Sequence, residues 1–195
     1  MLVNDTPHAL ALLSKFGTLS PEGQTKWLGV MRWQLFQKGQ LIQEAGSMCK
    51  TIYVVESGAA RIFYFKEQSE VTEYFAFAGE LIIRAESLLT GKPTHKAIEA
   101  LEDCRLLAID AAAWFSLFDE HADLERLYRH MLEKAFVHAI SRIESLQFKS
   151  ATERYLDLLE ETDIVQRIPL RHVASYLGIT QVSLSRIRAE ISRKH

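Results

Sequence analysis

The last 30 residues carry side chains that could contact phosphate groups and base edges. Between Gln166 and His195 the sequence has six lysine or arginine residues and one acidic residue, a net charge of +5. The whole chain carries −2, so residues 1–165 carry −7. A basic end on an acidic body is typical of a module that binds nucleic-acid phosphates. Arginine can also donate two parallel hydrogen bonds to guanine.

Two short helices joined at a sharp corner are predicted for residues 170–187. Val173 and Leu177 lie one helical turn apart and share a face. Gly178 follows, the residue type that most easily adopts the left-handed conformation at the end of a helix. Thr180 is a good cap for a second helix, in which the apolar spacing resumes. This pattern indicates a helix-turn-helix, whose second helix enters the DNA major groove.

The residues on the outer face of the second helix distinguish a helix-turn-helix from an ordinary helical hairpin. With Leu184, Ile187 and Ile191 facing inward, about 100° per residue turns Val182 and Arg186 outward, together with Ser185 and Arg193. A hairpin within a globular core would explain the apolar positions but not this polar and basic face. We therefore expect double-stranded DNA as a partner.

Composition excludes several classes of protein. The chain has 195 residues, of which 48% are hydrophobic and 25% charged, as in a globular protein. No apolar run approaches the roughly 18 residues that span a bilayer, and the first residues lack the basic and apolar parts of a secretion signal. Cys49 and Cys104 are too few for the four thiolates of a typical iron–sulfur cluster. We expect a cytoplasmic protein with reduced thiols and no membrane partner.

Short segments rich in β-branched and aromatic residues begin at about Trp33 and end near Asp110. Two short helices, at residues 7–16 and 21–31, precede them. Glycines separate the segments, and the spacing is that of strands five to eight residues long. Six strands are predicted, at residues 40–45, 51–57, 59–65, 70–77, 95–101 and 104–110. Many short strands in close succession favour a small antiparallel barrel or jelly roll.

A helix about twice the average length is predicted for residues 122–148. Apolar residues recur along it at spacings of three and four, and one barrel has little surface to cover them all. We expect a second copy of the helix to do so in a two-fold homodimer; the alternative is a helix packed lengthwise on its own barrel. The residues expected at the dimer interface are Leu124, Leu127, Tyr128, Met131, Ala135 and Ile143.

A capping box at Ser150–Glu153 predicts that a new helix begins at Ala151. The chain is thereby divided into an N-terminal domain with two helices and a β-roll (1–121), a dimerisation helix with a hinge (122–149) and a helix-turn-helix domain (150–195). The fold class is α+β.

This order of elements resembles the cAMP receptor protein/FNR family of bacterial transcription regulators. The motifs that carry the resemblance are FQKGQLIQEAG (36–46), IYVVESGAARIFYF (52–65), GEL (79–81), GKPTHKAIEALEDC (91–104), ATERYLDLLEE (151–161) and RIPLRHVASYLGITQVSLSRIR (167–188). The resemblance implies a jelly-roll domain like those that bind cyclic nucleotides, and a helix-turn-helix of the winged-helix type. It also implies a homodimer on a two-fold operator, regulation by a small-molecule effector and RNA polymerase as a partner.

The family pattern also assigns roles to the second helix. Gln181, Val182 and Arg186 occupy the positions that read bases, and Thr180 and Arg188 are expected to contact phosphates. The predicted DNA-binding set is Thr180, Gln181, Val182, Ser183, Ser185, Arg186 and Arg188. Val182 stands where the family usually has an acidic residue, so we expect a different operator sequence.

The nucleotide-binding motif departs from the family pattern. Cyclic-nucleotide binders have an arginine after the proline, and here Thr94 occupies that position. Ile82 replaces the small residue that usually follows Gly-Glu-Leu. We therefore expect no tight binding of cAMP, and the effector stays open. The candidate effector residues are Gly79, Glu80, Leu81, Thr94, His95 and Lys96; Lys96 could hold another anion or simply be a surface lysine.

Two other functions are compatible with the sequence. One is a constitutive DNA-binding dimer whose barrel is a scaffold. The other is a metalloenzyme with a cupin-like barrel, which would need a His-x-His pair with further ligands. The predicted barrel has a single histidine, His95, so we expect no enzyme activity, no metal and no cofactor.

Overall fold

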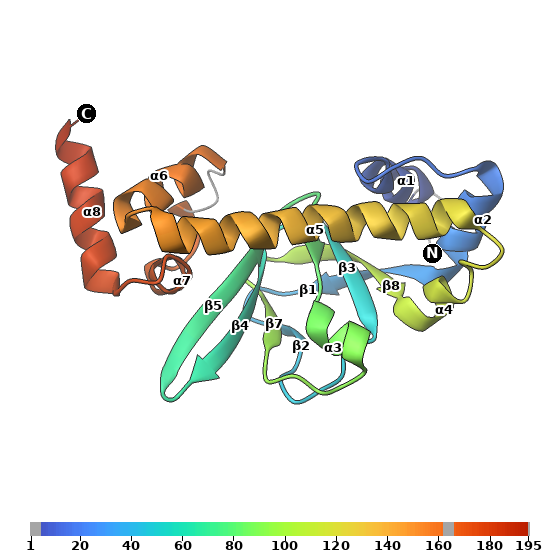
Figure 1. Ribbon diagram of the computed structural model, residues 1–195, viewed down its shortest axis with the longest axis horizontal. Coiled ribbons are helices and arrows are strands. Elements are labelled where there is room, and N and C mark those ends of the chain that lie inside the picture. Colours follow the sequence, from blue (N-terminus) through green and yellow to red (C-terminus); the bar gives the residue numbers. More distant parts are fainter. Residues whose placement is uncertain (1–4, 162–165, 195) are drawn as a thin grey trace.

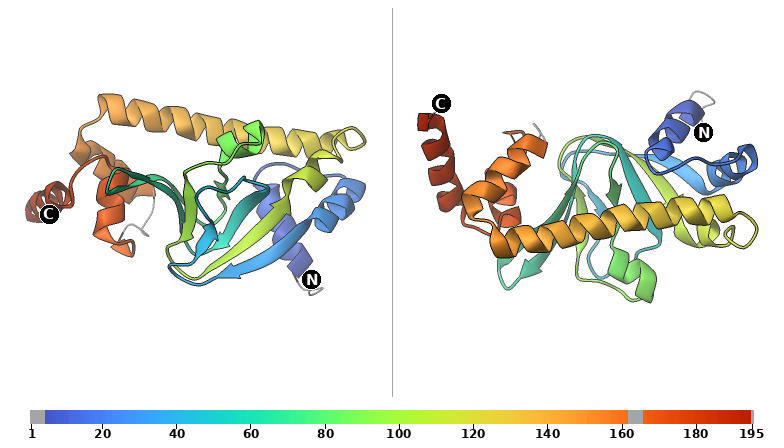
Figure 2. Two further views of the ribbon diagram at one scale, coloured as in Figure 1. Left: turned by 90° about the horizontal axis from the view of Figure 1, so that it is seen from below. Right: turned by 45° about the horizontal axis from the view of Figure 1, so that its top comes forward.

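The structure is a computed structural model that describes residues 5–161 and 166–194. The predicted domain limits at residues 1 and 195 therefore lie outside the described residues. One long helix, α5 (Ala122–Phe148), runs across the molecule with the β-roll on one side of it (Figure 1). Two N-terminal helices lie near its start, and the three C-terminal helices gather at its other end (Figures 1 and 2).

The N-terminal helices are α1 (Thr6–Ser14) and α2 (Pro21–Val30). Ser20 caps α2 by accepting a hydrogen bond from Gly23 N, and Pro21 takes the first helical position, where a missing N–H costs nothing. The Ser20 backbone N–H and hydroxyl both donate to Asp123 Oδ2, at 2.8 Å each. These contacts attach α2 to the first turn of α5.

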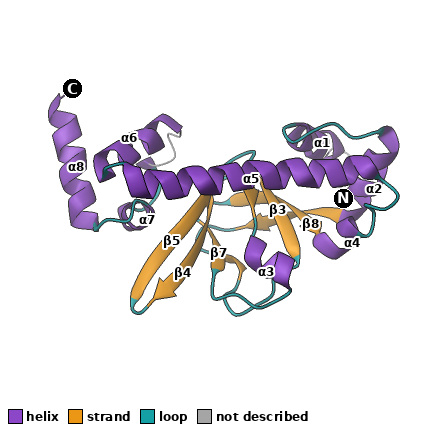
Figure 3. Cartoon of the chain, in the orientation of Figure 1, coloured by secondary structure: helices purple, strands orange, loops and turns teal. Residues whose placement is uncertain are grey.

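The β-roll consists of two four-stranded antiparallel sheets, ordered β1-β8-β3-β6 and β2-β7-β4-β5. All six predicted strands are confirmed, and the structure adds the strands β1 and β6. It also adds the short helix α3 (Figure 3). The elements are β1 (Met31–Phe36), β2 (Leu41–Gln43), β3 (Thr51–Ser57), β4 (Ala60–Lys66), β5 (Ser69–Ala76), β6 (Leu81–Ile82), α3 (Ala85–Thr90), β7 (Ala97–Ala100), β8 (Cys104–Asp110) and α4 (Ala111–Phe115).

Apolar side chains fill the space between the two sheets. Ile82, Ile98 and Leu106 are fully buried there, and Val55 and Ala108 join them. A separate core lies under α5, where the N-terminal helices and Trp114 pack against the helix. The antiparallel roll expected from the sequence is therefore formed around a packed interior.

Helix α5 has two different faces. Leu124, Leu127 and Met131 are at most 1% exposed because their own chain covers them. These three residues, which were expected at the dimer interface, therefore have almost no surface left for a second copy of the chain. Tyr128 and Ala135 also pack against this core, partly buried. For this half of the helix the alternative interpretation, packing on the chain's own body, describes the structure.

The second half of α5 presents large apolar side chains to solvent. Phe136, Ile140 and Ile143 are 68%, 40% and 50% exposed, and Leu146 is 45% exposed. At about 100° per residue, these four lie within about 120° of one another around the helix. We refer to Phe136, Ile140, Ile143 and Leu146 as the exposed stripe. Of the predicted interface residues, Ile143 belongs to it.

The C-terminal helices are α6 (Ala151–Glu161), α7 (Leu170–Tyr176) and α8 (Gln181–Lys194). The predicted capping box begins α6: Glu153 N donates to Ser150 Oγ at 3.3 Å, and Ser150 N donates to Glu153 Oε2 at 2.7 Å. Among residues 151–161 and 166–194 no strand is formed, so these residues do not supply the wing of a winged helix. No helix in the described part of the chain is long and apolar enough to cross a membrane.

Candidate nucleic-acid interface

The corner between α7 and α8 has the geometry that its sequence predicts. Gly178 has a φ of 69°, in the left-handed region where a side chain would cause strain. Gly178 N donates to Ser175 O and Ile179 N to Ala174 O, at 3.0 Å each, which satisfies carbonyls at the end of α7. Thr180 Oγ1 accepts from Ser183 N at 3.1 Å and so caps α8.

A small apolar core fixes the angle between the two helices. Val173 and Leu177 on α7 are 1% exposed, and Leu184 on α8 is fully buried. Tyr155 and Leu158 on α6 complete this core. Because the inner face of α8 is held in this way, its outer face has a defined orientation.

The outer face of α8 carries most of the predicted DNA-binding residues. Val182 is 61% exposed, and Gln181, Ser185, Arg186 and Arg188 are exposed as well. The two arginines make no ion pair with any described residue, so both guanidinium groups are available to a ligand. The face is therefore open, basic and rigidly supported.

The hydroxyl groups of the predicted set are partly used inside the protein. Ser183 Oγ lies 2.9 Å from Thr180 Oγ1, and Ser183 is half-buried. Ser185 Oγ donates to Gln181 O, one turn earlier, at 3.0 Å. The structure thus gives Thr180 and Ser183 a capping role, and leaves Gln181, Val182 and Arg186 as the exposed group near the start of the helix.

The helix-turn-helix packs against the chain's own β-roll through a buried ionic cluster that sequence reasoning missed. Arg61 on β4 is 1% exposed. Its guanidinium donates to Glu99 Oε2 and Glu70 Oε1, at 2.7 Å each, and lies 2.8 Å from His172 Nδ1 on α7. Ser175 on α7 also accepts from the backbone N–H of Thr72, at 2.8 Å. Because β5 is an edge strand, that contact satisfies a donor the sheet leaves open.

The candidate effector residues lie in two separate places. Gly79 and Leu81 flank Glu80, whose Oε2 accepts from Phe77 N at 2.8 Å. Glu80 lines a cavity of about 250 Å³ together with Lys15, Tyr74, Lys134 and His138. Neither Thr94 nor Lys96 lines that cavity, so the structure does not join the two halves of the expected effector site there.

The residues that follow Pro93 are occupied by structural contacts. Thr94 is buried, and its hydroxyl accepts from Lys96 N at 3.3 Å. Lys96 forms an ion pair with Glu73 at 2.6 Å. His95 is exposed, with its ring edge-on to Tyr64. The Lys96 ammonium group, expected as a charge for an anion, is therefore already paired with a carboxylate.

Arg84 is a buried cation that no sequence motif singles out. It is 3% exposed and donates to Gln43 Oε1, Glu44 O and Lys96 O at 2.8 Å each, and to Ser47 Oγ at 3.0 Å. These four hydrogen bonds use most of the five N–H donors of the guanidinium group. Arg84 therefore fastens the turn before β3 to β7 and has little capacity left for a ligand.

The described residues thus form a jelly roll, a long helix and a helix-turn-helix with an exposed basic face. Residues 33–121 match the family described as cyclic nucleotide-binding domain. Comparison with curated proteins gives no match.

Solved structures with the same fold cover most of the chain. FixK2 from Bradyrhizobium japonicum is 20% identical with a TM-score of 0.72, over 85% of this chain and 86% of that one. A protein from Eubacterium rectale described as a regulator of the crp/fnr family is 21% identical with a TM-score of 0.68, over 90% and 85%. The c-di-GMP-responsive global regulator CLP of Xanthomonas campestris is 16% identical with a TM-score of 0.68, over 87% and 90%. Residues 33–121 are therefore similar to cyclic nucleotide-binding domains, and the chain shares the fold of these solved structures, in agreement with the resemblance seen in the sequence.

Proposed function

We propose that the protein is a DNA-binding transcription regulator that acts as a homodimer. The observation that carries this proposal is the outer face of α8. There Gln181, Val182 and Arg186 are exposed on a helix whose inner face is locked by Leu184. An arginine in this position can make a bidentate contact with guanine, and Val182 can contact a thymine methyl group. The +5 charge of residues 166–195 supplies the attraction to phosphates.

The exposed stripe supports the dimer. Four large apolar side chains along one helix face form the kind of patch that soluble proteins cover by association. A second copy of α5, related by a two-fold axis, would bury the same residues on both sides. The dimer would present two copies of α8 to half-sites about one DNA turn apart.

The contacts of Thr94 and Arg84 support a roll that does not bind cAMP tightly. A cyclic phosphate held out of water needs a charged donor. Thr94 offers a neutral hydroxyl, and the Arg84 guanidinium is already committed to four acceptors. The same observations favour a second candidate, a constitutive DNA-binding dimer in which the roll is a scaffold. RNA polymerase is the partner that either form of the regulator would contact or block.

A genome-wide map of bound DNA, made with wild-type protein and with Arg186→Ala, tests the proposed function. We expect the wild type to enrich a two-fold symmetric sequence and the variant to lose the preference at one base pair of each half-site. Enrichment without symmetry, or no enrichment above background, would contradict a dimeric operator-binding regulator. Repeating the map after cells are grown under different conditions separates an effector-controlled regulator from the constitutive one.

A further inference from the structure

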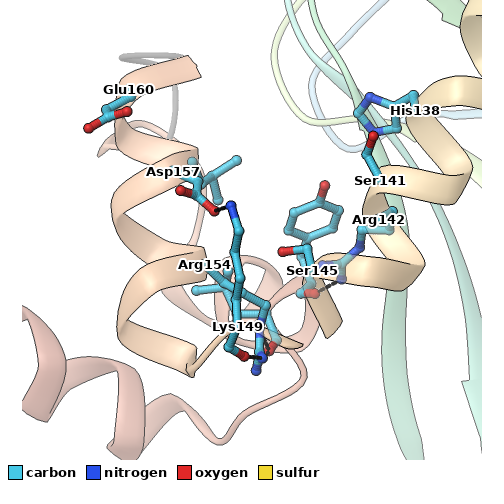
Figure 4. Close-up of a pocket in the computed structure, with 11 residues that line it drawn as sticks. His138, Ser141, Arg142, Ser145, Lys149, Arg154, Asp157 and Glu160 are labelled. Atoms are coloured by element: carbon cyan, nitrogen blue, oxygen red, sulfur yellow. Dashed lines mark hydrogen bonds and ion pairs between the residues drawn. The ribbon is translucent and has the colours of Figure 1, made fainter. Parts of the chain in front are cut away.

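A cavity of about 380 Å³ lies where α5 meets the helix-turn-helix domain (Figure 4). Its walls come from the end of α5, from α6 and from the end of α7. This volume is in the range of small-molecule sites. The lining residues used below are Ser141, Arg142, Ser145, Arg154, Asp157 and Tyr176.

Two arginines from different helices meet in this cavity. Arg142 on α5 donates to Tyr176 O and stacks over the Tyr176 ring, with its guanidinium carbon 3.8 Å from the ring centroid. Arg154 on α6 donates to Leu177 O through Nε and Nη2, at 3.2 and 2.8 Å. The two carbonyls directly precede Gly178, so both arginines hold the corner of the helix-turn-helix.

No described acidic side chain pairs with the two arginines of the cavity, Arg142 and Arg154. Asp157 lies 2.8 Å from Lys149, and Glu160 is exposed at the far end of α6 (Figure 4). Burial lowers the pKa of Arg142, and the charge of Arg154 acts in the same direction. A partly desolvated cation beside another cation is costly unless a negative charge accompanies it.

We propose that this cavity binds a small anion that carries a phosphate or carboxylate group. Arg142 uses one acceptor, Tyr176 O, among the described residues, while a guanidinium has five N–H donors arranged for such groups. Ser141 and Ser145 line the same wall and add hydroxyl donors. The anion would be bound between three helices that belong to both sides of the hinge.

The position of the cavity gives the anion a regulatory role, and this part of the inference rests on the proposed DNA-binding function. An anion held by Arg142 and the adjacent helices would fix the corner of the helix-turn-helix relative to α5. At about 100° per residue, Arg142 and Ser145 are turned about 100° and 160° away from Ile143. Leu146, at one end of the exposed stripe, is turned only about 40° from Arg142, so a dimer partner on the stripe would lie next to the cavity.

Thermal unfolding and titration calorimetry of the full chain, with pyrophosphate or citrate, test the site. Sodium chloride at matched ionic strength controls for general screening. We expect one of the two anions to raise the unfolding midpoint by several degrees at about a hundred times its dissociation constant. Arg142→Gln should weaken that anion about tenfold or more, because a charged bidentate donor is lost. The anion that acts distinguishes a phosphate from a carboxylate ligand.

Three further variants locate the binding. Arg126→Gln alters an exposed arginine on the same helix and should leave the shift unchanged. Arg186→Ala should also leave it unchanged, because Arg186 lies on the DNA-facing helix. Ser145→Asp places a carboxylate one turn from Arg142 and should abolish the shift without removing an arginine. If Arg142→Gln fails to fold, Ser145→Asp alone decides the outcome.

A shift that persists in Ser145→Asp, a shift lost in Arg186→Ala, or no shift with either anion would overturn the anion site. None of these results depends on operator binding, which is measured separately on DNA. A protein that binds its operator but no anion would retain the proposed function and lose this inference. A protein that binds the anion but no DNA would retain the anion site and lose the proposed DNA-binding function.

Discussion

Arg61 Nη1 and His172 Nδ1 lie 2.8 Å apart and join the β-roll to the first helix of the helix-turn-helix. Because arginine can only donate, His172 Nδ1 must accept, and its ring is neutral with the proton on Nε2. Protonation of Nδ1 would place two donors against each other. Glu70 Oε1, 3.1 Å from the same nitrogen, favours the proton, but it also pairs with Arg61. The contact between the two domains therefore depends on a neutral histidine.

We predict that acid weakens this contact. Burial lowers the pKa of His172 from 6.5 to about 4, and the charges of Arg61 and Arg171 add to the effect while Glu70 opposes it. Between these two pKa values, His172 is protonated in the unfolded chain but stays neutral in the folded chain. The stability that neutral His172 contributes should be fully present above pH 6.5. The free energy of unfolding should then fall as the pH is lowered toward 4, by up to about 1.4 kcal/mol per pH unit.

Urea unfolding of wild type and His172→Gln between pH 7 and pH 5 measures this term. Burial opposes ionisation of Glu70, but its hydrogen bond and charge interaction with Arg61 outweigh burial and lower the pKa below 4.5. The stability that Glu70 contributes is lost only at lower pH, so it does not interfere in this window. Equal slopes for the two proteins would contradict the assignment to His172.

Removing Arg61 should destabilise the fold strongly. Arg61→Gln leaves Glu70, Glu99 and His172 without their shared donor, and breaking a buried ionic cluster costs about 3–5 kcal/mol. Arg129→Gln is the matched control, because its pair with Glu133 is exposed at 3.8 Å and contributes less than about 0.5 kcal/mol. Chemical unfolding of both variants provides the comparison; similar small losses would show that the cluster adds nothing to stability.

The dimer prediction is tested on the exposed stripe. Ile143→Glu should place two charges at the two-fold interface and shift the protein to monomers in sedimentation experiments. Val137→Glu is the control, since Val137 is 63% exposed but turned about 120° away from Ile143. Met131→Glu should instead unfold the protein, because Met131 is buried in its own chain. A dimeric Ile143→Glu variant would contradict this interface.

The roll should bind cAMP much more weakly than a site with an arginine at position 94. Loss of a bidentate charged donor weakens binding by about two to four powers of ten. Thermal unfolding with micromolar cAMP should therefore show no shift. A clear shift at that concentration would mean that other residues hold the phosphate.

The pattern of neighbouring residues in the sequence was sufficient to predict most of the helices and strands. The strands around Val54 and Ile98, the capping box at Ser150 and the left-handed Gly178 all follow from nearest-neighbour chemistry. Strand β6 has two residues and helix α3 has six, too few to show a helical or strand period, and the sequence does not predict them. Strand β1 is not predicted either.

The long-range contacts could not be predicted from the sequence. Arg61 and His172 are separated by 111 positions, and each looks like an ordinary surface residue in its own segment. Arg84 is hidden in the same way. The apolar pattern of α5 predicts a helix that needs a covering surface, but it could not show that Leu127 packs within the chain while Ile143 is exposed.

Selection of binding sites from random-sequence DNA by purified wild-type protein and Arg186→Ala tests the central claim most directly. We predict that the wild type selects a two-fold symmetric sequence with a guanine in each half-site. The variant should lose about 1–3 kcal/mol of discrimination at that base pair. Arg188→Ala should weaken binding to all sequences alike and reduce its salt dependence. An unchanged preferred sequence in Arg186→Ala, or no selected sequence for the wild type, would contradict the account.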